Sequence, residues 1–389
     1  MLRIAVVTPL YPLPGEPHRG IFIYRTVREL ARLAPVEVLC PLAKYPSWRW
    51  LQPRRHLPYR GGDEDPIGEP AANRFEYPTL PLVGRPFNGI LSGRVVLAAL
   101  ERLRPDVVLA YWVYPEGWGA CWAARKLGIP VVLGARGSDL RKPGDFLSAA
   151  LARSALRRAD FVITVSEDLR RIALQAGVPA ERVRSIPNGC DRGLFRPMDK
   201  FAARAELGIS PDDRLVLFVG RLVPVKGVEI LVEAFRRALP RCPGLHLWLV
   251  GEGPLRDALH ERAAQIRGHV HFAGAVPPEE IATWIGAADV VCLPSYSEGC
   301  PNAVIEALAC GRPVVASNAG GIPELVDDDC AILTPVGDVE ALAEALVEAL
   351  RRPWDPERIA QRFRRGWDQV AAETYEVCGR VARQRQLGS

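Results

Sequence analysis

LVLFVGRLVPVKGVEI, residues 215–230, joins an apolar run to the start of a helical pattern. The run ends at Gly220, and a short apolar segment bounded by glycine is typical of a buried strand. Beyond it, GVEILVEAFRRAL places its apolar residues three and four positions apart, which indicates an amphipathic helix. A strand followed by such a helix predicts one step of a βαβ unit, and therefore a parallel sheet.

The same alternation runs through the whole chain. The apolar runs are RIAVVTP, VEVLC, DVVLAYW, PVVLGA and FVITVS in the first half, then RLVLFVG, LHLWLVG, HVHFAG, DVVCLPS and PVVAS in the second. At 389 residues the chain is too long for one ordinary core. We therefore expect an α/β protein of two doubly wound, Rossmann-like domains.

The join between the domains is expected where the pattern is interrupted. Pro, Gly and Asn break it in PNGCDRGLFRPMDK, residues 187–200. We predict a first domain over 1–192, a second over 193–365, and a C-terminal crossover helix over 366–389 that packs back across the domains. The helical pattern is expected to continue from Trp354 to the end of the chain.

Composition narrows the class of protein. The nine cysteines are scattered, with no C-x-x-C pair, which argues for a reducing cytosol and against structural zinc or disulfides. The start MLRIAVVTPLYP lacks a signal-peptide pattern, and no run of about 18 apolar residues occurs. We therefore expect a cytoplasmic protein that is neither exported nor membrane-spanning, with no metal site and no cofactor.

Charge is shared unevenly between the halves. Residues 1–200 hold 30 Lys and Arg against 19 Asp and Glu, a net of +11, whereas the remainder carries −6. The first half is therefore expected to face something anionic, such as a membrane surface, a pyrophosphate or a nucleic acid. Net charge alone does not choose among the three.

Arg221 and Lys226 are candidate phosphate ligands. They lie between the strand and the helix of the opening stretch, and ligands of parallel sheets bind beyond the carboxyl ends of strands. A cation beside a helix start opposes the helix dipole unless an anion intervenes, which favours a bound phosphate. The alternative is a solvent-exposed pair of cations.

Two glutamates stand eight positions apart in SEGCPNAVIEALACG, residues 297–311. Pro301 suits a helix start and Gly311 a helix end, so a helix is expected from about Pro301 to Cys310. Glu306 is the only charged residue within it, and a desolvated carboxylate needs a partner. Either an arginine elsewhere in the core pairs with it, or Glu298 and Glu306 hold opposite ends of one ligand.

Glycines mark further candidate loops, because a residue without a Cβ lets the protein backbone approach a ligand closely. Gly251 and Gly253 precede Pro254 in LVGEGPLRDAL, and Gly20 precedes the helical pattern IFIYRTVRELARL. The latter gives a helix start suited to phosphate, although such glycines are also ordinary turn residues. No G-x-G-x-x-G follows the first strand of either half, which disfavours a nicotinamide dehydrogenase.

The first half offers fewer polar candidates. Arg136 and Asp139 follow a strand in GARGSD, where they either meet a ligand or form an internal salt bridge. Tyr111 ends another strand, and an aromatic there is more often packing. Residues 42–74 break the βαβ rhythm and are either a solvated insertion or a membrane-facing or acceptor-facing segment. The aromatic and basic residues behind the second interpretation are Trp48, Arg49, Trp50, Arg54 and Arg55.

Together these motifs resemble the family 4 glycosyltransferases, retaining enzymes of the GT-B architecture with two Rossmann-like domains facing a central cleft. The most specific element is SEGCPNAVIEALACGRPVVAS, which matches the family's Glu-x7-Glu pattern. GRLVPVKG, IPNGCDRGLFRP and GGIPELV also match, and the first half is similar to members that build exopolysaccharides and teichuronic-acid-like polymers. The resemblance covers nearly the whole chain.

The resemblance implies roles for the candidate residues. Arg221 and Lys226 would neutralise the diphosphate leaving group without a divalent metal, Glu306 would bind the ribose and Glu298 the transferred sugar. Gly20, Gly251, Gly299 and Asn302 would also contact the donor, the loop at Val276 would meet the base through its backbone, and Gly320 and Gly321 would line the cleft. Tyr111 stands where many members carry a histidine, and the catalytic role of that histidine does not carry over to it. Tyr111 either places the donor sugar by a hydrogen bond or packs in the core.

The leading hypothesis is a transferase that moves a hexose, from a UDP-sugar by preference, to a glycan or polyprenyl-linked acceptor at the inner face of the cell membrane. A GDP-mannose-dependent mannosyltransferase is one alternative. A GT-B phosphorylase or epimerase would keep the fold and change the reaction. A nucleic-acid-binding protein is disfavoured, because the basic half lacks aromatics interleaved on a basic strand or helix.

Overall fold

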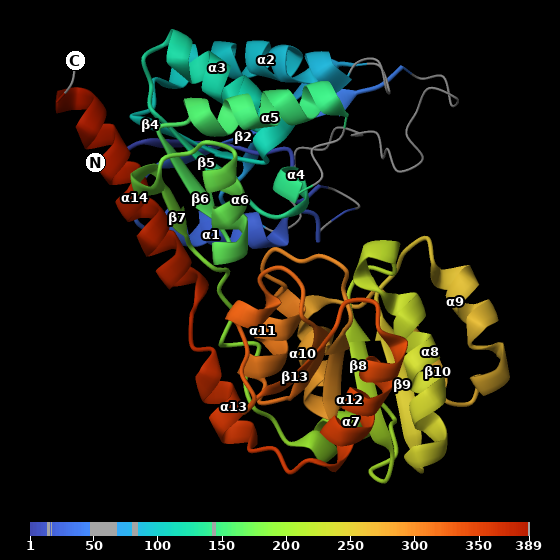
Figure 1. The fold of residues 1–389 in the computed structure, drawn as a ribbon. Helices are drawn as coiled ribbons and strands as arrows, with labels where there is room; N and C mark the ends of the chain where they lie inside the picture. The colour runs from blue at the N-terminus through green and yellow to red at the C-terminus, as the bar shows by residue number, and fades with distance from the viewer. Residues whose placement is uncertain (14–15, 17, 47–67, 80–84, 142–144, 388–389) are drawn as a thin grey trace. The chain divides into compact units, whose positions relative to one another are not determined.

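The structure is a computed structural model that describes residues 1–13, 16, 18–46, 68–79, 85–141 and 145–387 (Figure 1). The chain divides into two compact units. Unit 1 comprises Met1–Asn188 with Trp367–Ser389, and unit 2 comprises Gly189–Gly366. The changes of unit therefore fall at residues 188/189 and 366/367, and the C-terminal helix belongs to unit 1.

Unit 1 is built on a seven-stranded parallel sheet in the order β3-β2-β1-β4-β5-β6-β7. Its strands are β1 (Ile4–Val7), β2 (Val36–Lys44), β3 (Ala72–Pro78), β4 (Val107–Tyr111), β5 (Val131–Ala135), β6 (Phe161–Thr164) and β7 (Val183–Ser185). Its helices are α1 (Ile21–Leu30), α2 (Asn88–Leu103), α3 (Trp118–Lys126), α4 (Ser138–Arg141), α5 (Phe146–Arg158), α6 (Glu167–Gln175) and α14 (Trp367–Leu387).

The central strands of this sheet are buried on both faces, as the continuous apolar runs require. Strand β1 pairs with β2 on one side and β4 on the other, with Ile4 opposite Val36 and Val107. Helices α2, α3 and α5 pack together on one side of the sheet (Figure 1). Helix α14 packs against α1 and strands β4 to β6, and adds Trp367 and Val370 to the core.

Unit 2 has a six-stranded parallel sheet in the order β10-β9-β8-β11-β12-β13. Its strands are β8 (Arg214–Val219), β9 (Leu245–Val250), β10 (Val270–Gly274), β11 (Val290–Leu293), β12 (Val314–Ser317) and β13 (Ala331–Thr334). Its helices are α7 (Lys200–Glu206), α8 (Val228–Ala238), α9 (Arg256–Arg262), α10 (Pro278–Ala287), α11 (Asn302–Ala309), α12 (Val339–Arg351) and α13 (Pro356–Arg362).

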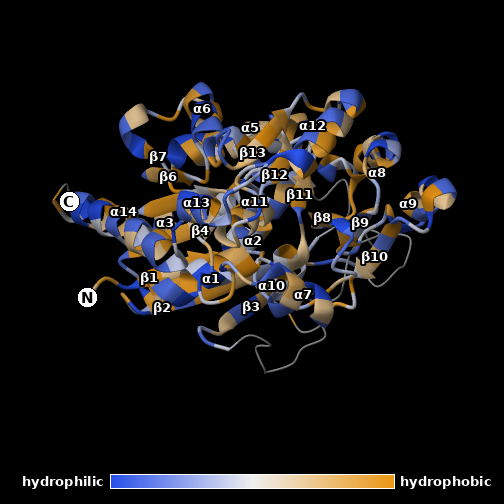
Figure 2. Cartoon of the chain, turned by 90° about the horizontal axis from the view of Figure 1, so that it is seen from below, coloured by the Kyte–Doolittle hydropathy of each residue, from blue (hydrophilic) through white to orange (hydrophobic). Residues whose placement is uncertain are grey.

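The covering helices are amphipathic, and α8 and α12 each show an apolar and a polar side in Figure 2. Along α8, Leu231, Val232 and Phe235 are buried while Arg236 and Arg237 are exposed. Burying each of the large apolar side chains stabilises the unit by about 1.5–3 kcal/mol.

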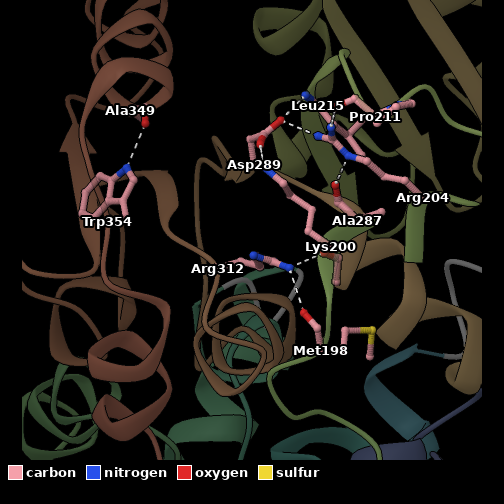
Figure 3. Close-up of polar contacts among 11 residues, drawn as sticks. Met198, Lys200, Arg204, Pro211, Leu215, Ala287, Asp289, Arg312, Ala349 and Trp354 are labelled. Carbon is pink, nitrogen blue, oxygen red and sulfur yellow. Dashed lines mark hydrogen bonds and ion pairs between the residues drawn. The ribbon is translucent and has the colours of Figure 1, made fainter. Parts of the chain in front are cut away.

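A buried ion pair ties α7 to the amino ends of two strands in unit 2 (Figure 3). Arg204 is 2% exposed, and its guanidinium donates to Asp289 at 2.7 Å, to the carbonyl of Pro211 at 2.8 Å and to that of Ala287 at 3.0 Å. The backbone N–H of Leu215 donates to the same carboxylate at 2.7 Å. Because every strong donor has an acceptor, this network fixes β8 and β11 at the sheet edge opposite their carboxyl ends.

Two expectations about element boundaries were wrong. The helical pattern after Trp354 is broken between α13 and α14, where Phe363 and Gly366 interrupt it. Three edge strands, β3, β7 and β13, were not predicted, because their sequences contain no apolar run of the kind used to predict strands. In residues 42–74, β2 continues to Lys44 and β3 begins at Ala72, whereas Trp48, Arg49, Trp50, Arg54 and Arg55 lie outside the described residues.

Candidate active site

Three loops meet at the carboxyl edge of the unit 2 sheet. The loop after β8 is joined to the loop after β11 by a hydrogen bond from the Tyr296 N–H to the Val225 carbonyl, at 2.9 Å. The Gly321 N–H, in the loop after β12, donates to the Glu298 carbonyl at 3.4 Å. Neighbouring parallel strands thus bring together the loops that carry most of the candidate donor ligands.

Gly227 makes the first of these crossings sterically possible. It has φ 65°, and a Cβ at this position would lie 2.0 Å from the carbonyl oxygen of Pro294. Both the left-handed backbone and the close approach therefore require glycine. As a result the chain turns sharply from Lys226 into α8 directly over the end of β11.

Lys226 and Glu298 form an ion pair at this crossing. The Lys226 Nζ lies 2.6 Å from Glu298 Oε1, and the Ser295 hydroxyl donates to the same oxygen at 2.6 Å. The lysine side chain is 25% exposed and the glutamate side chain 10%. A charge-assisted bond of this length orients both groups, and the lysine remains open to solvent.

The ion pair changes the electrostatic argument for a phosphate. Lys226 ends a 3₁₀ turn, Pro224–Lys226, immediately before α8, where its charge opposes the helix dipole. Glu298 offsets that cost within the protein itself. Arg221 lies in the same loop and is exposed, so the edge presents two cations of which one already has a carboxylate partner.

Gly251 and Gly253 support the loop that carries Arg221. A Cβ on Gly251 would lie 2.0 Å from the Gly220 carbonyl oxygen, and one on Gly253 would lie 2.2 Å from that of Leu222. The Leu222 N–H donates to the Glu252 carbonyl at 2.9 Å. The two glycines are therefore explained by the close packing of two loops, independently of any ligand.

Helix α11 carries the second glutamate. It spans Asn302–Ala309 with Pro301 at its N-cap position, one residue later than expected, and Gly311 follows its end with φ 72°. Glu306 is half-buried, and its expected partner, an arginine or a ligand hydroxyl, stays a prediction. Asn302 and Gly299 are also partly exposed near the start of the helix.

The remaining candidates of unit 2 lie on loops at the same edge. Val276 is half-buried between β10 and α10, two residues after Gly274, which has φ 76°. Gly320 has φ 58° in the loop after β12, and Gly321 follows it.

Asp139 in unit 1 holds the backbone of two loops. It is 3% exposed, and its carboxylate accepts from the backbone N–H groups of Gly137 at 2.7 Å, Arg136 at 3.0 Å and Val113 at 3.3 Å. The carboxylate therefore bonds main-chain groups, and the expected salt bridge to the Arg136 side chain is not the contact observed. Burial raises the pKa of this carboxyl group, and the backbone donors oppose the rise.

Arg136 and Tyr111 contact each other. The Arg136 guanidinium lies 4.9 Å from the centre of the Tyr111 ring and 5.0 Å from that of Phe22, and it donates to the Asn188 side chain at 3.0 Å. Tyr111 is 2% exposed, and burial raises its pKa to about 12. A packing role accounts for this tyrosine.

Gly20 is required by the backbone at the start of α1. It has φ 61°, and a Cβ there would lie 2.1 Å from the Leu10 carbonyl oxygen. The steric requirement explains the glycine without a phosphate at the helix start.

One buried group of unit 1 was missed from the sequence. Glu116 is 5% exposed, accepts a hydrogen bond from the Tyr77 hydroxyl at 3.1 Å, and has its pKa raised by burial to about 7. It follows Trp112, a non-glycine residue with φ 78°. The only signal was a carboxylate in YWVYPEG, directly after a strand.

Within the described part of the chain, no group of three or more His, Cys, Asp or Glu is arranged to hold a metal ion. The same residues contain no helix with the length and apolarity needed to cross a bilayer.

Comparison with known families matches both units. The description "Glycosyl transferases group 1" matches residues 213–352, and "Glycosyl transferase 4-like domain" matches residues 20–189. One relative is TuaC of Bacillus subtilis strain 168, whose name describes a teichuronic acid biosynthesis glycosyltransferase. It is 30% identical over 378 residues, which cover 92% of this chain and 91% of TuaC. A D-inositol 3-phosphate glycosyltransferase of Segniliparus rotundus is 42% identical over 154 residues, 38% of this chain and 34% of that protein.

Solved structures share the fold. HepE of Anabaena, crystallised with UDP, superposes with a TM-score of 0.69 at 23% identity, over 98% of this chain and all of that one. Sucrose-phosphate synthase of Thermosynechococcus elongatus superposes with a TM-score of 0.71 at 23% identity over the full length of both chains. Two parallel-sheet, Rossmann-like units with these structural neighbours constitute a GT-B fold.

Proposed function

The chain belongs to the group 1 glycosyltransferases with a 4-like N-terminal domain, and on that premise we propose that it moves a hexose from a nucleoside diphosphate sugar to a glycan or polyprenyl-linked acceptor. The reaction retains the configuration of the sugar. The donor favoured by the proposal is a UDP-sugar, and the product is part of a cell-surface polysaccharide.

The observation that carries the proposal is the Lys226–Glu298 pair where three loops meet. In the proposed complex the diphosphate lies at the start of α8, where backbone N–H groups, Lys226 and the exposed Arg221 stabilise the charge that develops as it leaves. Glu298 then accepts hydrogen bonds from hydroxyls of the transferred sugar, and Glu306 from those of the ribose. Gly299 and Asn302 lie beside the sugar, and Val276 offers its backbone to the base.

The chemical step breaks the bond between the anomeric carbon and the donor diphosphate oxygen and forms a bond from that carbon to an acceptor hydroxyl on the same face. The acceptor proton passes to the leaving diphosphate. Fixed cations and helix-end N–H groups supply the electrostatic stabilisation, so no metal or cofactor is part of the proposal.

Uridine is preferred because structural neighbours of this chain have been crystallised with UDP and with UDP-glucose. The name of TuaC supports a polymer of the cell surface as the product. Action at the inner face of the membrane follows from the proposed polyprenyl-linked acceptor and from the net +11 of residues 1–200.

The thermal midpoint tests the donor site. UDP, GDP and ADP, each at about a hundred times its dissociation constant, would stabilise the protein by about 2.7 kcal/mol if bound. A shift with UDP that Lys226→Ala abolishes is the expected result. A shift with GDP alone would favour the mannosyltransferase alternative, and the absence of any shift in a folded protein would refute the donor site.

Acceptor dependence separates the transferase from the other reactions of the fold. A transferase consumes nucleotide sugar faster when an acceptor glycan is added, whereas an epimerase converts it without one. A phosphorylase would require inorganic phosphate instead.

A further inference from the structure

Four large apolar side chains of unit 1 are exposed at the beginnings of two helices. Phe87 and Ile90, at the start of α2, are 59% and 39% exposed, and Phe146 and Leu147, at the start of α5, are 84% and 48% exposed. Apolar side chains scattered singly on a surface are ordinary, whereas a cluster rimmed by polar groups marks an interaction site.

Tyr114 brings the two helix starts together. Its hydroxyl donates to the Pro86 carbonyl at 2.8 Å, next to Phe87. Burial raises the pKa of that hydroxyl to about 12, and the negative charge of Asp145, the N-cap of α5, adds to the rise. The short 3₁₀ turn that ends at Phe87 also packs directly against α5. The exposed residues of the two helices therefore belong to one surface.

The helices behind this surface are strongly cationic. Helices α2, α3 and α5 contain one acidic residue, Glu101, and seven basic ones. The basic residues, all exposed, are Arg94, Arg102, Arg125, Lys126, Arg153, Arg157 and Arg158. None of the seven takes part in an ion pair with another described residue. On unit 2, by contrast, Arg237 and Arg241 pair with Glu340 and Glu344.

Apolar and basic residues share the outer faces of the helices. Phe87, Ile90 and Arg94 are spaced three and four residues apart, and Phe146, Arg153 and Arg157 are spaced seven and four apart, so each set lies on one side of its helix. Seven residues of α-helix span about 10 Å. If the apolar tips enter a bilayer, Arg94 and Arg153, two turns behind Phe87 and Phe146, lie at the depth of the lipid headgroups. Arg157, eleven residues or about 16 Å behind Phe146, then lies above the headgroups, where it still attracts an anionic surface.

We propose that this apolar tip surface (Phe87, Ile90, Phe146 and Leu147) with its arginines Arg94, Arg153 and Arg157 docks on an anionic phospholipid bilayer. Unpaired arginines next to inserting phenylalanines complement a negatively charged lipid surface. This inference rests on the proposed function and deepens it. The proposed polyprenyl-linked acceptor is presented at the surface of a membrane, where a docked enzyme would meet it.

Co-sedimentation of the full chain with vesicles tests the proposal. We expect binding to phosphatidylcholine vesicles that contain 30% phosphatidylglycerol, weaker binding to pure phosphatidylcholine, and a decline with added salt. The double variant Phe87→Ser/Phe146→Ser is expected to weaken binding to anionic vesicles at least tenfold. Arg94→Gln/Arg153→Gln is expected to weaken it about tenfold and to leave binding to neutral vesicles unchanged.

Matched controls come from unit 2. Phe201 is 58% exposed, close to the value for Phe87, and Arg214 and Arg267 are exposed arginines. Phe201→Ser and Arg214→Gln/Arg267→Gln are expected to bind vesicles as the parent does. Equal losses in the controls, or no vesicle binding by the parent, would overturn the proposal. Concentration-dependent self-association abolished by Phe87→Ser/Phe146→Ser would overturn it in favour of a second copy as the occupant.

The UDP-induced shift of the thermal midpoint, measured on the same preparations, separates this inference from the donor site. Variants of the tip surface that fold are expected to keep the full shift. A parent that shows the shift but does not bind vesicles would refute membrane docking alone, whereas a parent that binds vesicles without the shift would refute the donor site alone.

Discussion

The two units of the chain wind their sheets in the same way and use the carboxyl edges differently. In each unit the first strand pairs with the second and the fourth, and unit 1 adds only β7 at its far edge. At the edge of unit 2, Lys226 is partly exposed and pairs with Glu298, which also accepts a hydrogen bond from the Ser295 hydroxyl. At the edge of unit 1, Asp139 and Glu116 are buried and hold backbone or tyrosine groups.

The difference shows that polar residues after parallel strands have two separate uses. A side chain that bonds neighbouring N–H groups fixes the shape of its loop, and its removal should cost stability. A side chain that remains open to solvent is available to a ligand, and its removal should cost binding while the fold persists.

Lys226→Ala should give the largest effect. Loss of one preorganised cation at a leaving group lowers the rate by about 10²–10³-fold, equivalent to about 2.7–4 kcal/mol. The free energy of unfolding should change by about 1–2 kcal/mol at most, because Glu298, with 10% of its side chain exposed, keeps the Ser295 hydroxyl as a donor. Release of UDP from the nucleotide sugar with the largest thermal shift measures the first quantity, and urea unfolding the second.

Lys44→Ala is the matched control for that variant. Lys44 is also paired with a glutamate, Glu76, but on strands β2 and β3 of unit 1. It should leave UDP release unchanged. If the Lys226→Ala protein retained full activity, Lys226 would only fix the shape of its loop, as Asp139 does in unit 1, and would not act on a ligand.

Asp139→Ala should lower stability and leave donor binding intact. Three backbone N–H groups lose their acceptor, which destabilises the fold, whereas removal of the buried carboxylate also removes the cost of desolvating it. We expect a net loss of about 2 kcal/mol in the free energy of unfolding. The amides of Val113, Arg136 and Gly137 should then exchange with solvent about 30-fold faster by hydrogen exchange. Asp139→Asn keeps an acceptor oxygen and should show a smaller increase, and UDP binding by unit 2 should persist in both variants.

Glu116 gives unit 1 a dependence on pH. Its pKa in the folded protein is raised to about 7 from 4.5, so folding favours the protonated form. This contribution to stability is present below pH 4.5 and is lost as the pH rises through 7. The parent should therefore lose up to about 3 kcal/mol between pH 4.5 and pH 8 from this group.

Glu116→Gln should remove that loss and keep an acceptor for the Tyr77 hydroxyl. Urea unfolding at several pH values measures it, and Glu101→Gln, an exposed change in the same unit, serves as the control. The same pH profile in Glu116→Gln and the parent would show that another group is responsible.

The fold was predictable where strands are buried on both faces. All ten apolar runs became strands, because a central parallel strand needs continuous apolar sequence. The strands β3, β7 and β13 lie at sheet edges, where a strand needs less apolar sequence, and each lacks the apolar run by which the edge strand β10 was still predicted. The break between α13 and α14 was missed because an amphipathic pattern can continue through a short irregular segment.

For the candidate site, the sequence indicated which loops matter but not what their polar groups contact. The βαβ pattern predicted that Lys226 and Glu298 lie in loops that follow strands of a parallel sheet. Their mutual ion pair depends on the crossing at Gly227, which is a long-range contact with Pro294. The steric reason for Gly20 and Gly251 could not be read from the sequence, which does not show the carbonyl that passes within about 2 Å of a would-be Cβ. Their contact with a donor stays a prediction. Glu116 was missed because burial of a loop carboxylate leaves no periodic signal.

Glu298→Gln should give the smallest effect and would separate two uses of one carboxylate. The amide keeps the shape but loses the charge that holds Lys226, so affinity for UDP alone should stay the same or rise a few-fold. Affinity for the nucleotide sugar should fall about tenfold, or about 1.4 kcal/mol, because an amide oxygen accepts weaker bonds from sugar hydroxyls. Calorimetric titration with both ligands measures the two affinities.

Ser295→Ala is the control, since it removes a second donor to the same oxygen without changing the charge. It should leave both affinities within about twofold of the parent. If Glu298→Gln instead changed the two affinities equally, the carboxylate would act only by orienting Lys226. The glutamate of unit 2 would then be a loop-fixing residue like Asp139 of unit 1, and Lys226 alone would distinguish the two edges.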